Sequence, residues 1–238
     1  LVKIIDENGV DLYREDFNFM STLEALRQAD APGRRGMEEM RWVEGFYRLW
    51  DDLLQKFPRL VIDNCASGGR RIDLETIRRS LVLWRTDYNC FANLNCDALQ
   101  SQTAGLARWG IPNSVSPACA AGDTYQFRSG MADGLVFSLD EFGNLDRPMS
   151  AENTAWLRRM LDDAKELRRH FSGDFYCLID GGLNPDCWMS WQLHNPVTGE
   201  GAVMVFRRQE SMMTNAALRL RALDIDAKYL FRNADDGE

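Results

Sequence analysis

The chain has 238 residues, of which 45% are hydrophobic and 11% aromatic, so it has enough apolar side chains for a folded core and is not a disordered chain. Its formal net charge of −8 argues against nucleic acid as a partner, because a phosphate backbone binds basic surfaces. No apolar run approaches the roughly 18 to 20 residues of a membrane span, and residues 1–20 lack a signal-peptide pattern, so we expect no contact with a membrane. The scattered cysteines, interpreted as reduced, favour a cytoplasmic protein.

Strands and helices alternate through most of the chain, after a helix tail that ends at Asn8 and Gly9. Apolar runs and three- and four-residue periodicity predict these elements before residue 170. They are a strand at 10–17, a helix from Met40 to Phe57 ended by Pro58, a strand at 60–64, a short helix at 72–79, a strand at 81–85, a helix at 94–109, a short strand and loop at 111–123, a helix at 124–132, a strand at 134–140 and a helix capped by Ser150. Residues 18–36 are expected to form a polar loop.

The pattern changes after Gly173. Strand-like runs at 187–193, 201–206 and 218–223 follow one another with turn signals but without helical periodicity, which predicts an antiparallel β region. Strands that alternate with helices instead form a parallel sheet, whose functional site lies at the carboxyl ends of the strands. We therefore expect an α/β domain over residues 1–173 and the start of an antiparallel β domain over residues 174–238.

Polar residues end three of the predicted strands. Arg14, Asp16 and Asn18 alternate along the first strand and would share one face of it. The second strand runs into residues 65–69, a Cys-Ala-Ser-Gly-Gly turn, and the third runs into residues 84–87. Each ending alone could be a solvated strand end or an ordinary strand-to-helix turn. Three in succession favour an active-site edge.

These stretches resemble motifs of family 36 of the glycoside hydrolases, the α-galactosidase or melibiase family. Arg14, Asp16 and Asn18 are similar to the nucleophile motif, in which a basic residue stands two before an aspartate and an asparagine two after it. Residues 64–73 resemble the loop N-C-A-S-G-G-G-R-x-D, and residues 84–87 resemble the segment W-x-[ST]-D. The resemblance extends along essentially the whole chain. It implies strands four to eight of a partial (β/α)8 TIM barrel, followed by the antiparallel β domain.

The resemblance implies a retaining glycosidase, in which one carboxylate attacks the sugar and another protonates the leaving oxygen. Asp16 would be the nucleophile, and its neighbour Arg14 would favour the charged carboxylate. Asp87 would be the general acid/base, and the apolar run before it would raise its pKa. The substrate would be an oligosaccharide that ends in α-linked galactose.

Further residues receive substrate-binding roles from the same resemblance: Arg14, Asn18, Cys65, Gly68, Gly69, Arg70 and Trp84. Two of them depart from the family pattern, because Arg14 replaces a lysine and Arg70 replaces the third glycine of the loop. An α-linked N-acetylgalactosamine therefore remains an alternative sugar. Trp84 could be a sugar platform or a core residue, and we expect Arg71 and Asp73 to hold the loop as an ion pair.

The resemblance also implies that the chain is a fragment, inactive alone, because the barrel strands before residue 10 would be missing. A non-catalytic carbohydrate-binding half-barrel is a second alternative, which the two aspartates disfavour. No cofactor is implied, and a homo-oligomer is left open. A zinc site is not expected from two histidines and six cysteines without a Cys-x-x-Cys pair. We interpret most of the cysteines as reduced core residues.

Overall fold

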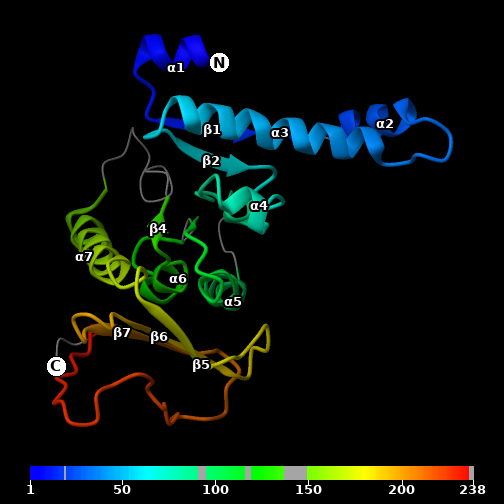
Figure 1. Ribbon diagram of the computed structural model, residues 1–238. Coiled ribbons are helices and arrows are strands. Elements are labelled where there is room, and N and C mark those ends of the chain that lie inside the picture. Colours follow the sequence, from blue (N-terminus) through cyan, green and yellow to red (C-terminus); the bar gives the residue numbers. More distant parts are fainter. Residues whose placement is uncertain (19, 91–94, 116–118, 137–148, 236–238) are drawn as a thin grey trace. The chain divides into compact units, whose positions relative to one another are not determined.

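The computed structural model forms two compact units, Leu1–Asp87 and Tyr88–Glu238, which are described separately below. Figure 1 shows the chain with its helices and strands labelled. The structure describes residues 1–18, 20–90, 95–115, 119–136 and 149–235.

The described part of the first unit is a parallel two-stranded sheet with helices. Its elements are α1 (Val2–Asn8), β1 (Leu12–Asp16), α2 (Met20–Ala29), α3 (Met37–Lys56), β2 (Val61–Cys65) and α4 (Leu74–Ile77). The register of the two strands runs from the pair Leu12 and Val61 to the pair Asp16 and Cys65. Both strands therefore end at the same edge of the sheet.

The third predicted strand, at residues 81–85, is wrong as a continuous strand: among the described residues, Leu81 forms a parallel bridge with Asp63, and the bridged stretch extends only to Val82. The physical reason lies two residues further on. The backbone N–H of Leu83 donates to the side-chain Oδ1 of Asp63 at 3.1 Å. A side-chain acceptor there takes the place of a backbone acceptor of β2, so the ladder ends after one bridge.

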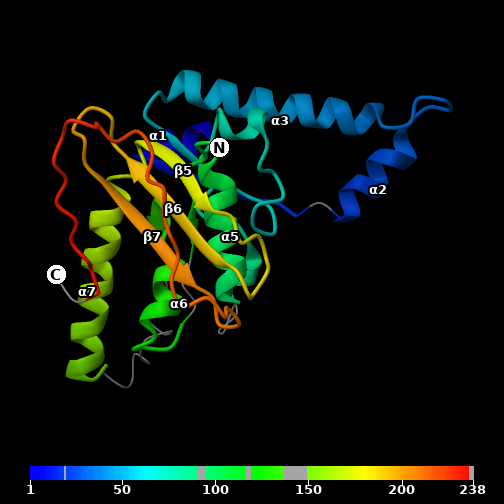
Figure 2. The ribbon, with the colours of Figure 1, turned by 90° about the horizontal axis from the view of Figure 1, so that it is seen from below.

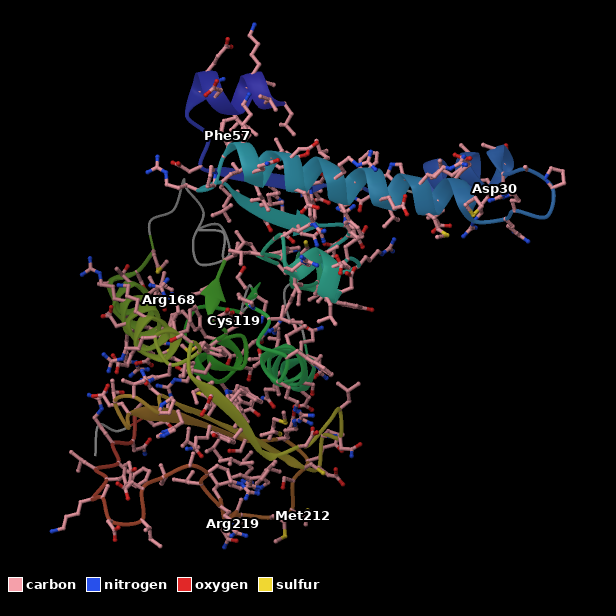
Figure 3. The ribbon with its side chains drawn as sticks, in the orientation of Figure 1. Asp30, Phe57, Cys119, Arg168, Met212 and Arg219 are labelled. Atoms are coloured by element: carbon pink, nitrogen blue, oxygen red, sulfur yellow. The ribbon has the colours of Figure 1, made fainter. Side chains whose placement is uncertain are left out.

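Helix α3 builds the core of the first unit. Its apolar stripe packs Phe46, Trp50 and Leu53 against Ile62 of β2, and all four side chains are buried. The helix ends one residue earlier than expected, at Lys56, where the Phe57 N–H donates to Leu53 O before Pro58. Figures 1 and 3 show α3 beside the two strands and Phe57 at its end.

Helix α2 was not expected, because residues 18–36 read as a polar loop. The loop is confined to the connection between α2 and α3, where Asp30 is labelled in Figure 3. The Asp30 carboxylate accepts the backbone N–H groups of Gly36 at 2.6 Å and Glu38 at 2.9 Å. These two bonds lower the pKa of Asp30, and they satisfy amides at the start of α3 that have no partner within the helix.

The described part of the second unit contains a parallel pair, an antiparallel sheet and three α-helices. Its elements are α5 (Cys96–Ala107), β3 (Ser114–Val115), α6 (Thr124–Ser129), β4 (Gly134–Leu135), α7 (Ala151–Arg168), β5 (Asp174–Ile179), β6 (Trp188–His194) and β7 (Gly201–Arg207), preceded by a 3₁₀ turn at Asp87–Cys90. Strands β3 and β4 pair in parallel, and β5, β6 and β7 pair antiparallel in that order. Residues 137–140 of the predicted strand at 134–140 lie outside the described residues, and Ser150 caps α7 as expected.

The helices of the second unit cover one face of its antiparallel sheet, as Figures 1 and 2 show. Trp191 of β6, Phe127 of α6 and Met160 of α7 are fully buried in this layer. Residues 208–235 run along the opposite face, where Figure 3 labels Met212 and Arg219.

The strand predicted at 218–223 is wrong, because this segment has no ladder partner in the described structure. The side chain of Gln192 holds it instead, donating to Arg221 O and accepting from Arg221 N, both at 2.8 Å. A single amide side chain thus occupies the place where a backbone pairing was expected.

The helices and the cysteines bear on the expectations about membrane contact and the core. None of the described helices is long and apolar enough to cross a membrane. All six cysteines lie among the described residues and are free thiols, but only Cys65 and Cys119 are buried, so the assignment of most of them to the core is wrong. The division at residue 173/174 stays a prediction, although β5 begins at Asp174.

Candidate active site

Three alternating polar residues lie together at the carboxyl end of β1. Asp16 is the last residue of the strand, and its Oδ2 lies 3.5 Å from Nη2 of Arg14. Asn18 donates from Nδ2 to Oδ1 of Asp16 at 3.4 Å. The expected shared face is therefore present, and the carboxylate has a cation and an amide donor as neighbours.

A buried carboxylate, Asp63 of β2, holds Arg14 from the other side. Nη1 of Arg14 donates to Oδ2 of Asp63, whose side chain is only 3% exposed. Burial alone would lower the pKa of Arg14, but the bond to Asp63 and its negative charge outweigh this and raise the pKa. Asp63 is not among the site residues expected from the sequence. Its signal in the sequence is a charged residue directly after the apolar run of a buried strand.

The loop after β2 folds over the end of β1. Cys65 stands opposite Asp16 in the strand register. Burial raises the pKa of the Cys65 thiol, and the nearby Asp16 carboxylate raises this pKa further. Ser67 takes a left-handed backbone conformation with φ of 46° and donates from Oγ to Oδ1 of Asn18 at 2.8 Å. The loop is thereby fixed to the strand that carries Asp16.

The two glycines of this loop lie against the segment that carries Asp87. A Cβ atom on Gly68 would come within 2.6 Å of Thr86 Cα and 2.7 Å of Asp87 N, and φ at Gly68 is +76°. A Cβ on Gly69 would collide with the carbonyl oxygen of Arg85. Only glycine permits this approach at Gly68, since it needs both the positive φ and the missing side chain. Asp87 itself is exposed.

Arg71 makes contacts with residues at the ends of both strands. It donates to Oδ1 of Asn64 at 3.1 Å and to the carbonyl oxygens of Cys65 and, at 3.4 Å, Phe17. Its guanidinium also lies 5.0 Å from the ring centroid of Phe46. Arg71 holds the loop as expected, but through Asn64 and Cys65 of β2, Phe17 directly after β1, and Phe46 of α3.

The expected partner of Arg71, Asp73, has a different role. Its side chain accepts the backbone N–H groups of Glu75 and Thr76 and so caps α4. Thr76 completes a reciprocal capping box by accepting the Asp73 N–H at 3.2 Å.

The opposite face of β1 carries a second carboxylate, Glu15, which is not among the site residues expected from the sequence. Oε2 of Glu15 accepts from the Tyr13 hydroxyl at 2.7 Å and from the Trp50 indole N–H at 3.3 Å. Burial and the bond to Glu15 raise the pKa of Tyr13. The alternation along the strand thus separates Glu15, which faces the helix, from Asp16, which faces the candidate site.

The remaining predicted site residues are less closely tied to the site. Arg70 is exposed and Trp84 is half-buried. The described residues contain no group of three or more His, Cys, Asp or Glu side chains arranged to hold a metal ion.

The melibiase family model matches residues 1–126, which contain every residue of this site. The chain belongs to the melibiase family. A curated relative, α-galactosidase Mel36A of Lactobacillus acidophilus, is 28% identical over 99% of the chain and 32% of its own length. An Escherichia coli α-galactosidase is 36% identical over 36% of the chain and 11% of its own length.

Solved structures of the same family have a similar fold. A variant of the family 36 α-galactosidase AgaA from Geobacillus stearothermophilus, crystallised with raffinose, superposes with a TM-score of 0.63 at 20% identity, over 94% of this chain and 32% of that one. This melibiase chain thus spans about a third of the length of Mel36A and of the AgaA variant.

Proposed function

We propose that the chain forms part of a retaining α-galactosidase, with Asp16 as the nucleophile and Asp87 as the general acid/base. One observation carries the proposal: the loop at residues 65–69 lies against both Asp16 and the backbone of Asp87. It faces Asp16 at Cys65 and packs Gly68 on the backbone of Asp87. Family membership supports the reaction class, and this arrangement supports the choice of residues.

The division of labour follows from the neighbours of each carboxylate. Asp16 lies beside the guanidinium of Arg14 and accepts from Asn18, contacts that stabilise an ionised oxygen that can attack. Asp87 lies at the start of the 3₁₀ turn Asp87–Cys90, exposed to an incoming glycosidic oxygen. In a retaining mechanism this group first donates its proton to the leaving oxygen and then takes one from water.

We further propose that the parallel segments belong to a (β/α)8 barrel. β1, β2 and the bridge at Leu81 lie side by side in parallel, and β3 and β4 form a second parallel pair. Barrel enzymes place their catalytic residues at the carboxyl ends of such strands; Asp16 and Cys65 end β1 and β2, and Asp87 follows the segment bridged at Leu81. The antiparallel strands β5–β7 would then begin the β domain that follows the barrel.

The substrate we propose is an oligosaccharide with a terminal α-linked galactose. The AgaA variant crystallised with raffinose supports an α-galactoside. N-acetylgalactosamine is the competing sugar, because Arg70 stands in the loop expected to face the 2-position.

The test uses the complete protein that contains this chain, assayed with aryl α-galactoside and aryl α-N-acetylgalactosaminide. We expect hydrolysis of the galactoside with retention, seen as α-galactose in the first product by proton NMR. Release of β-galactose would show inversion and refute the double displacement. Preference for the N-acetylated substrate would keep the mechanism and change the sugar.

A further inference from the structure

Asp63 is a buried carboxylate with two separate partners. The residue is 2% exposed and lies in β2, opposite Arg14 in the strand register. A carboxylate this deeply buried is stable only when its charge is paired and its oxygens are hydrogen-bonded.

The two oxygens of Asp63 are divided between a side chain and the backbone. Oδ2 accepts from Nη1 of Arg14, and Oδ1 accepts the backbone N–H of Leu83 at 3.1 Å. One carboxylate therefore fixes the guanidinium on β1 and the chain segment that leads to Asp87.

The two terminal nitrogens of Arg14 have different surroundings: Nη1 contacts the buried Asp63, and Nη2 faces the exposed Asp16. Its Nη2 lies 3.5 Å from Oδ2 of Asp16, and the side chains of Arg14 and Asp16 are 39% and 43% exposed, against 3% for Asp63. The guanidinium thus lies between an inner anion that anchors it and an outer anion at the candidate site. An arginine can make both contacts because its fork has donors on two edges.

We propose that Asp63 is the positioning residue that sets Arg14 for the sugar and for Asp16. The inference rests on the proposed function, since it takes Arg14 as the group that faces the substrate. Asp63 prevents Arg14 from turning fully onto Asp16, where a tight ion pair would occupy the oxygen that must attack. It does so without touching the substrate.

Asp63→Asn in the complete protein tests this with little change of shape. The amide retains an oxygen that can accept from Leu83, but it loses the charge and turns an N–H donor towards the donors of Arg14. We expect kcat/KM for an aryl α-galactoside to fall about 10- to 100-fold, the range for losing one hydrogen bond to a charged group. The matched control is Asp51→Asn, which breaks the Arg79–Asp51 pair at an exposed position and should change kcat/KM by less than about twofold.

A double-mutant cycle separates positioning from a general structural role. In an Arg14→Met background, which retains no guanidinium to position, Asp63→Asn should lower kcat/KM by less than about threefold. The same drop in both backgrounds would overturn the proposal. The cycle needs both single variants folded, and Arg14→Met leaves Asp63 buried without its ion-pair partner, so the folding of each variant is first checked by circular dichroism.

A crystal structure of the Asp63→Asn variant separates this inference from the proposed function. The guanidinium of Arg14 should leave its position beside residue 63 and approach Asp16, whatever sugar the enzyme cleaves. A guanidinium that stays in place would overturn the positioning role even if the protein is an α-galactosidase. Failure of the wild type to hydrolyse α-galactosides would instead refute the proposed function and leave the movement of Arg14 to decide the role of Asp63.

Discussion

Gly68 lies against the backbone of Asp87 so closely that a Cβ atom on it would be 2.7 Å from the Asp87 nitrogen. The contact joins the loop after β2 to the proposed acid/base without any side chain. Because no side chain fits between the two backbones, any larger residue at position 68 must displace Asp87.

Gly68→Ala should therefore displace Asp87 and lower kcat by about 100-fold, because a shift of about 1 Å in a catalytic group has that effect. The measurement is the rate on an aryl α-galactoside in the complete protein. Gly33→Ala is the matched control, since Gly33 has a similar φ of +79° but no atom within 4 Å of the added Cβ. Equal losses in both variants would mean that backbone strain, rather than the contact with Asp87, causes the effect.

The two aspartates should differ in their response to azide. Asp16→Ala should lose turnover with every leaving group, and azide should replace the nucleophile and give the β-galactosyl azide by a single inversion. Asp87→Ala should retain the first step with good leaving groups, and azide should attack the glycosyl-enzyme and give the α-galactosyl azide. Product stereochemistry by NMR checks the assignment. The same azide anomer from both variants would refute it.

Thr76 should contribute measurably to the stability of the loop around Arg71. Its buried hydroxyl donates to Arg71 O and accepts from the Asp73 N–H, so Thr76→Val removes both bonds, although Arg71 O keeps the Asn64 amide as a donor. We expect a loss of about 1 kcal/mol in the free energy of unfolding, from urea denaturation. Thr198→Val, at an exposed turn where the hydroxyl accepts only a 3.3 Å bond from Glu200, is the control and should change stability by less than about 0.5 kcal/mol.

The turn between α2 and α3 should loosen in acid. The backbone N–H groups of Glu38 and Gly36 lower the pKa of Asp30 in the folded chain. Its stabilising contribution is therefore complete above the pKa of an unfolded aspartate, about 4, and is lost as the pH falls through the lower folded value. Hydrogen exchange at the Gly36 and Glu38 amides should accelerate over that range in the wild type. Asp30→Asn should remove this acid-dependent step, and a step that persists in the variant would assign it to another group.

Much of the site could be predicted from the sequence, because local rules govern it. Alternation along a strand places Arg14, Asp16 and Asn18 on one face, and this geometry is present in the structure. The long helix before Pro58 and the Ser150 cap were predictable for the same reason, since periodicity and capping act over a few residues.

The parts that could not be predicted depend on contacts between distant residues. Asp63 takes the N–H of Leu83 and so ends the pairing of the third segment, and Gln192 holds Arg221 where a strand was expected. In both cases a side chain bonds to a backbone group that a strand partner was expected to bind. The two residues are 20 apart in the first case and 29 apart in the second. The sequence shows each side chain but not the backbone group that it meets, so local rules could not predict either contact.

The assignment of Asp16 as nucleophile is tested most directly by trapping the covalent intermediate. The complete protein would be treated with a fluorinated α-galactosyl fluoride, which forms the glycosyl-enzyme quickly and releases it slowly, and then digested for peptide mass spectrometry. The account predicts one galactosyl adduct, on the carboxylate of Asp16, and loss of labelling in Asp16→Ala but not in Asp87→Ala. An adduct on Asp87 or on any other residue would contradict it.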